Sequence, residues 1–118
     1  MKISNKALVV TYIIIALSAL IATWYHNILF IKTSPNGLLG FINGVYANHA
    51  AASIANDVLF LGIAVNILMI VEAKRLGIKY VWIYILLSFV VAISVMAPIF
   101  LAVRQWTIER HKIEDSNL

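Results

Sequence analysis

Long apolar segments dominate the pattern of residues along the chain. They cover about residues 7–31, 50–71 and 80–103, and almost no charged residue interrupts them. A helix needs roughly 20 residues to cross a hydrocarbon layer of about 30 Å, so each segment is long enough to span a membrane. None shows the two-residue alternation of a membrane β-barrel strand. The pattern therefore predicts an all-α integral membrane protein with three transmembrane helices.

The connection between the first two segments predicts a short helix over about residues 35–47. It contains no Lys, Arg, Asp or Glu. Ser34 can cap a helix whose first turn holds Pro35. Apolar residues then recur at the helical spacing i, i+3, i+4 and i+7, at Leu38, Phe41, Ile42 and Val45. We expect this helix to lie in the membrane interface or to re-enter the membrane.

The second connection is short and predicts an antiparallel hairpin of the second and third spans. Gly77 can adopt the left-handed conformation that ends a helix, and Lys74 and Arg75 suit the preceding turn because cations complement the helix dipole. Three crossings would divide the basic residues into two groups: Lys2, Lys6, Lys74, Arg75 and Lys79 on one side, and Lys32, Arg104, Arg110 and Lys112 on the other. The larger group favours the N-terminus inside and the C-terminus outside.

Composition supports a single membrane domain over residues 1–118. Hydrophobic residues make up 63% of the chain and charged residues only 12%, against about a quarter in soluble domains. The absence of cysteine excludes disulfides, thiolate metal sites and cysteine nucleophiles. The net charge of +4 is spread over the segment ends without interleaved aromatics, so it fits membrane lipids rather than nucleic acid. No motif indicates a cofactor.

Polar residues gather where the three predicted spans would meet at one membrane face. The candidate ligand-binding residues there are Tyr25, His26, Asn48, Asn56, Asp57 and Arg104. A bare carboxylate inside a span costs about 2.5–3.5 kcal/mol, so Asp57 should face protein or water and have a partner. Two interpretations stay open: an ion pair of Asp57 with Arg104 that joins the second and third helices, or an acid in a water-accessible cavity. In the second interpretation, Asp57 and His26 are the candidate catalytic residues.

The first span carries two further features. His26 follows two aromatic residues and equally fits an anchor at the membrane boundary. A pair of histidines without helical spacing is a weak signal, so no metal site is predicted. Ser18 and Ala22 form a small-residue pair that would let a neighbouring helix approach closely, which favours self-association.

Residues of the second and third spans predict contacts between these helices. We expect Asn66 and Ser88 to hydrogen-bond across the hairpin. Glu72 and Arg75 have the i, i+3 spacing of a surface ion pair at a helix end. Pro98 removes one helical hydrogen bond, so it can kink the third helix and open space beside Asp57.

Several of these residues occur together in a known family. Asn48 and Asp57 open the second span, EAKRLG closes it, Trp82 follows, and PIFLAVR closes the third span. The strongest pieces are Glu72-x-x-Arg75-x-Gly77 and Pro98-x-Phe100-Leu101-x-x-Arg104. Over about residues 12–106 the chain resembles a family of small three-helix bacterial membrane proteins, domain of unknown function 2834. The resemblance implies a multi-pass protein of the bacterial inner membrane and no established activity.

Two functions stay open for such a protein. The first is a non-catalytic membrane module that forms a homo-oligomer or serves a membrane complex, and binds a lipid or another small apolar ligand at the polar face. The second is a small membrane enzyme or proton-coupled carrier for a lipophilic, isoprenoid-like substrate, with Asp57 as acid or base. The sequence lacks a second intramembrane acid, a phosphate-binding glycine loop and an HExxH helix. These absences favour the membrane module.

Overall fold

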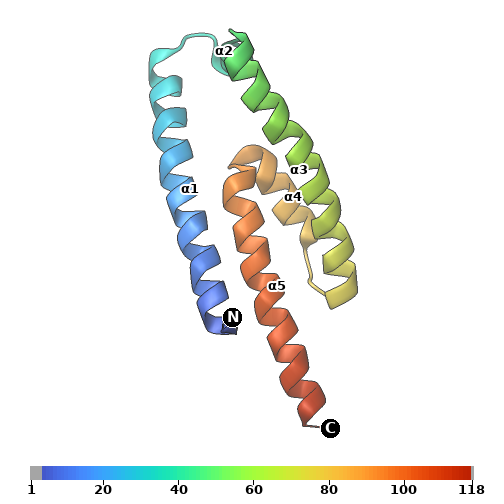
Figure 1. The fold of residues 1–118 in the computed structure, drawn as a ribbon. Helices are drawn as coiled ribbons and strands as arrows, with labels where there is room; N and C mark the ends of the chain where they lie inside the picture. Colours follow the sequence, from blue (N-terminus) through green and yellow to red (C-terminus); the bar gives the residue numbers. More distant parts are fainter. Residues whose placement is uncertain (1–3, 118) are drawn as a thin grey trace.

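The computed structural model describes residues 4–117 and is entirely helical apart from its turns. Its elements are α1 (Asn5–Thr33), α2 (Gly37–Val45), α3 (His49–Leu76), α4 (Val81–Val90) and α5 (Ile93–Ser116). Figure 1 shows α1 and α3 running in opposite directions, joined at one end by α2. Within the described residues, α1 and α3 are the two helices long and apolar enough to cross a membrane.

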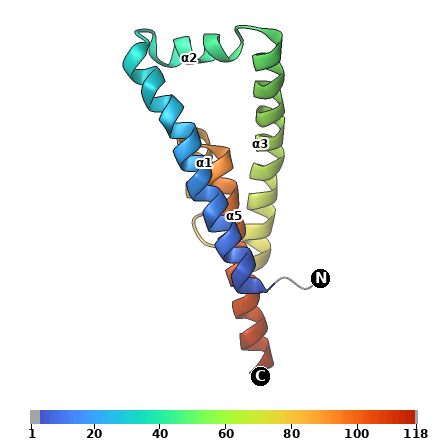
Figure 2. The ribbon, with the colours of Figure 1, turned by 60° about the vertical axis from the view of Figure 1, so that its left-hand side comes forward.

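The predicted third span is not one helix. The chain leaves helical structure at Val91–Ala92, and α5 then runs back toward the end where α3 finishes (Figures 1 and 2). With 10 residues, α4 is about 15 Å long, or half the thickness of a hydrocarbon core. Both ends of the described chain therefore lie at the end opposite α2, and the expectation of a C-terminus on the other side from the N-terminus is wrong.

A contact from α1 explains how this break is stabilised. Ending a helix leaves its last carbonyl groups without helical partners. The indole Nε1 of Trp24 donates a hydrogen bond of 3.0 Å to the carbonyl oxygen of Val91. Ala92 has extended backbone torsion angles, φ 175° and ψ 143°, and α5 begins directly after it. Pro98, the residue expected to kink the third span, lies inside α5 instead.

The other helix boundaries follow local sequence. The Asn48 side chain caps α3 by accepting a hydrogen bond of 2.8 Å from the Ala51 N–H. At the other end, Gly77 has the left-handed conformation, with φ 72°, as its sequence position predicts. The segment predicted to form a short helix contains α2, which starts at Gly37 after Asn36 rather than at Pro35.

The core lies along α5, which α1, α3 and α4 all contact. Ala16 of α1 packs against Val95 and Met96 of α5, and it is 3% exposed. A second cluster joins α3 to α5 and contains Met69, Ala73 and Phe100. The small residues on α1 that contact α5 thus include Ala16, whereas Ser18 and Ala22 of the predicted small-residue pair are exposed.

The predicted hydrogen bond between Asn66 and Ser88 is confirmed. The Ser88 hydroxyl lies 3.3 Å from Asn66 Oδ1 and 2.6 Å from the carbonyl oxygen of Ile85, so its proton is shared between two acceptors. The Asn66 amide in turn donates to the Gly62 carbonyl at 2.8 Å. Because Ser88 is 7% exposed, these bonds satisfy a buried hydroxyl and connect α3 to α4.

Candidate ligand-binding site

The polar face predicted from three crossings does not form around Asp57 and Arg104. Because α5 reverses direction, Arg104 lies at the end opposite α2 and pairs with Glu72. The Asp57 side chain is exposed on α3 and makes no hydrogen bond or ion pair with any residue in the range 4–117. The predicted Asp57–Arg104 pair and the inward orientation of Asp57 are both wrong.

Glu72 is the acid that joins two helices. Its carboxylate accepts hydrogen bonds from Arg75 Nε at 2.9 Å and Nη2 at 3.0 Å, and a third from Arg104 Nε. The Glu72–Arg75 pair is confirmed, but it is not a surface pair, since Glu72 is only 9% exposed. One carboxylate therefore binds two guanidinium groups and connects the last turn of α3 to α5.

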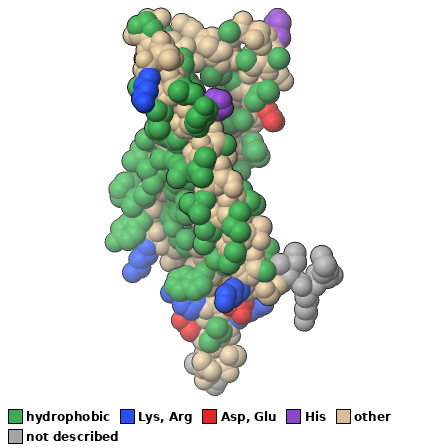
Figure 3. Space-filling model, turned by 90° about the vertical axis from the view of Figure 1, so that its left-hand side faces the viewer, with side chains coloured by type: hydrophobic (Ala, Val, Ile, Leu, Met, Phe, Trp, Pro, Cys, Tyr) green, Lys and Arg blue, Asp and Glu red, His purple; other side chains and the backbone are tan. Residues whose placement is uncertain are grey.

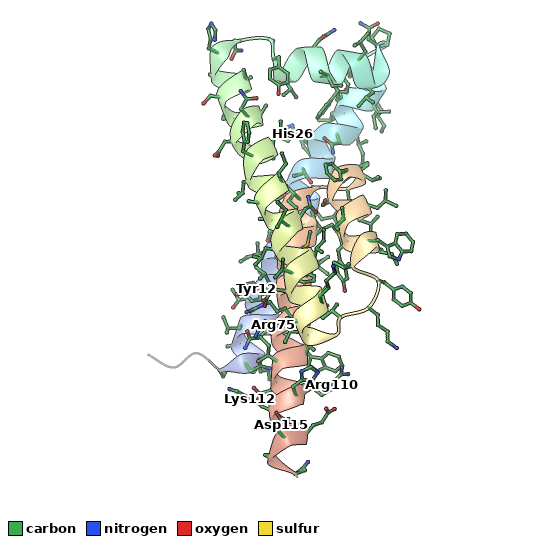
Figure 4. All side chains as sticks on the ribbon, turned by 90° about the vertical axis from the view of Figure 1, so that its right-hand side faces the viewer. Tyr12, His26, Arg75, Arg110, Lys112 and Asp115 are labelled. Carbon is green, nitrogen blue, oxygen red and sulfur yellow. The ribbon has the colours of Figure 1, made fainter. Side chains whose placement is uncertain are left out.

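The other predicted site residues do not form a common site. Tyr25 and His26 are exposed on α1, and their rings meet edge to face with centroids 5.2 Å apart. Figure 4 shows His26 toward the α2 end of the molecule. Asn56 accepts a hydrogen bond of 3.1 Å from the Tyr46 hydroxyl, which ties the end of α2 to α3. The Tyr46–Asn56 hydrogen bond and the Asn48 cap therefore both stabilise the start of α3.

The structure has a large cavity elsewhere, under α2. It has a volume of about 870 Å³ and lies between α1, α2, α3 and the tip of the α4–α5 hairpin. Figure 2 shows this hairpin tip ending well short of α2. Most of the lining is apolar, including Phe30, Phe41, Leu61, Phe89 and Val90. The volume lies within the usual range for small-molecule sites.

A few polar groups line the cavity. The Trp24 indole is already engaged by Val91. The side chains of Asn27, Ser34 and Ser94 also belong to the lining, and they make no hydrogen bond within the described part of the chain. An apolar cavity with a small number of polar groups suits a ligand that is mainly apolar and carries a hydrogen-bonding group.

Comparison with known proteins gives a family without a described activity. Residues 11–106 match the family model described as protein of unknown function DUF2834. The chain belongs to this family. The DUF2834 match covers the residues that line the cavity as well as Glu72 and Arg104. No curated protein and no solved structure matches the chain.

None of the predicted site residues lines the cavity of this DUF2834 protein. On α1, Trp24, Asn27 and Ile31 recur at i, i+3 and i+7 and share the helix face toward the cavity. Tyr25 and His26 belong to an exposed face of the same helix. The spacing of Trp24 and Asn27 was therefore the sequence signal for the cavity-lining face of α1. The sequence alone could not show whether this face or the adjacent face with Tyr25 and His26 lines a cavity, because that depends on where the α4–α5 hairpin ends.

Proposed function

We propose that this DUF2834 protein is a membrane-embedded helical module that binds a lipid or another small apolar molecule in the cavity under α2. One observation carries the proposal. The α4–α5 hairpin ends partway along α1 and α3, which leaves about 870 Å³ between two helices of membrane-spanning length. A cavity open to hydrocarbon on its flanks would be filled by molecules with apolar chains.

The exposed surface supports a position inside a membrane. Large hydrophobic side chains are exposed along both α1 and α3, among them Ile21 at 72% and Phe60 at 69%. Figure 3 shows hydrophobic side chains covering the middle of one flank. Exposed apolar area of this extent is rare on soluble monomers. In a bilayer the same side chains would contact acyl chains, with α1 and α3 as the spanning helices of a multi-pass protein.

The hairpin tip supports a ligand with a polar group. Non-helical backbone is tolerated at membrane depth where it is covered by protein or lines a cavity. Val91 and Ala92 form such a segment, and both line the cavity next to Ser94. A ligand with an apolar chain and one hydrogen-bonding group would satisfy both parts of this lining. Asp57 is absent from the lining, so the geometry gives no support to an enzyme that uses it as acid or base.

Blocking the cavity tests the proposal. We expect the double substitution Val58→Trp and Leu61→Trp to weaken binding of radiolabelled oleic acid to the purified protein by about tenfold, because both side chains line the cavity and the larger rings take up space that the acyl chain would occupy. Oleic acid serves as the probe because it combines an apolar chain with a hydrogen-bonding group. Binding is measured by scintillation proximity at a detergent concentration just above micelle formation.

The matched control places the same two side chains elsewhere on α3. Ile63→Trp with Ile67→Trp changes exposed residues that do not line the cavity, so oleic acid should bind as it does to the wild type. Equal binding by all three proteins would place the bound molecule outside the cavity and refute the proposed site. Absence of saturable binding to the wild type would refute it as well.

A further inference from the structure

Basic residues gather at the end of the molecule opposite α2. Lys6 lies in the first turn of α1, Lys74 in the last turn of α3, and Lys79 in the connection to α4. Arg110 and Lys112 lie on the last turns of α5, and Figure 4 shows both at this end together with Arg75. We call Lys6, Lys74, Lys79, Arg110 and Lys112 the cationic end.

Acidic residues neutralise this end only in part, because the four described acids Glu72, Glu109, Glu114 and Asp115 stand against seven described Lys and Arg, which leaves a net charge of +3. Glu72 forms ion pairs with Arg75 and Arg104, so it pairs with none of the five residues of the cationic end. The other acids there are Glu109, Glu114 and Asp115, and no ion pair joins any of them to a basic residue within residues 4–117. At the α2 end, Lys32 is the only Lys or Arg among the described residues and Asp57 the only acid, so the net charge there is zero. The charge asymmetry therefore runs along the length of the molecule.

Exposed aromatic side chains accompany the cationic end. Tyr80, Trp82 and Trp106 are 65%, 61% and 55% exposed, which is unusual for such large rings. The Arg110 guanidinium lies over the Trp106 ring, 4.8 Å from its centroid. Tyr and Trp concentrate at the headgroup level of membranes, where one part of the ring contacts acyl chains and the polar atom contacts water. Rings and cations at the same end of the molecule thus fit a layer of lipid headgroups.

We propose that the cationic end binds the headgroups of anionic phospholipids, and that this places the start of α1 and the end of α5 on the cytoplasmic side. The inference rests on the membrane position in the proposed function, but not on the ligand in the cavity. The cytoplasmic leaflet carries a negative surface potential that attracts basic residues beside membrane helices. Basic residues also concentrate in the cytoplasmic loops of membrane proteins. Both rules place the cationic end on the cytoplasmic side. The start of α1 and the end of α5 lie there together, because the hairpin returns α5 to the side where α1 begins.

The experiment compares two spin-labelled lipids at the surface of the reconstituted protein. The full chain is placed in phosphatidylcholine bilayers with a trace of spin-labelled phosphatidylglycerol or spin-labelled phosphatidylcholine. The motionally restricted fraction of the electron paramagnetic resonance spectrum gives the relative association of each lipid. We expect phosphatidylglycerol to associate about threefold more strongly at low salt, and the preference to decline at high ionic strength.

Two variants locate the preference. Changing Lys79, Arg110 and Lys112 together to glutamine should bring the ratio close to one, whereas Lys32→Gln should leave it unchanged. Equal association of both lipids with the wild type would overturn the inference, and would instead fit an acidic protein as the partner of this end. An equal loss in both variants would also overturn it. Absence of any restricted fraction would show that the protein is not embedded, and would remove the proposed function too.

Discussion

Glu72→Gln is expected to destabilise the protein strongly, more than any other change to a single charged residue. The substitution removes the carboxylate that accepts hydrogen bonds from Arg75 and Arg104, and it leaves Arg104, whose side chain is 31% exposed, without its partner. Breaking such a pair by removing one member is costly because Arg104, which is only partly exposed, is then left without a counter-charge. We expect the melting temperature in detergent to fall by on the order of 10 °C. Circular dichroism during heating measures the change.

Asp57→Asn provides the matched control. It removes a carboxylate of the same helix, but one that is exposed and makes no ion pair among residues 4–117. We expect its melting temperature to match the wild type. Arg104→Gln should destabilise the protein, and combining it with Glu72→Gln should cost less than the sum of the single changes, because both remove the same contact. If Asp57→Asn proved as damaging as Glu72→Gln, the assignment of Arg104 to Glu72 would be contradicted.

Ala16→Leu is expected to have the second large effect. Ala16 is 3% exposed and packs against Val95 and Met96, so three added carbon atoms have no space between α1 and α5. Overpacking a close contact usually lowers the free energy of unfolding by about 1–3 kcal/mol. Denaturation by a denaturing detergent added to mild-detergent micelles, followed by circular dichroism, measures the change.

Ser18→Leu tests whether this contact is assigned to the correct face of α1. Ser18 lies two residues along the same helix and is exposed, so a leucine there should leave the stability of the chain within about 0.5 kcal/mol of the wild type. A loss at Ser18 equal to that at Ala16 would show that the small-residue pair Ser18 and Ala22 forms the packed face instead.

Much of the fold follows from local sequence. Hydrophobic runs identified α1 and α3, Gly77 marked the end of α3, and the Asn66–Ser88 contact followed from their positions on neighbouring helices. The reversal at Val91–Ala92 did not, because this dipeptide lies inside the apolar residues 89–93 with no glycine or proline beside it. Hydropathy depends only on which residues a segment contains, so a helical hairpin and a straight helix of the same residues have the same hydropathy.

The errors in the candidate site derive from that single reversal. Two acids, Asp57 and Glu72, lie near opposite ends of α3, and the direction of the last helix decides which of them Arg104 can reach. A straight third span brings Arg104 to Asp57, whereas the hairpin brings it to Glu72. The cavity has the same origin, because a full-length third helix would occupy the space that Trp24 and Asn27 line.

The position of the chain ends tests the hairpin most directly. The native chain has no cysteine, so single cysteines can be introduced as Lys6→Cys, Asn36→Cys and Asp115→Cys without a background. A membrane-impermeant maleimide is then applied to right-side-out and inside-out vesicles. We expect Lys6→Cys and Asp115→Cys to react from the same side and Asn36→Cys from the opposite side. Reaction of Asp115→Cys together with Asn36→Cys, from the side opposite Lys6→Cys, would show three crossings and contradict the hairpin.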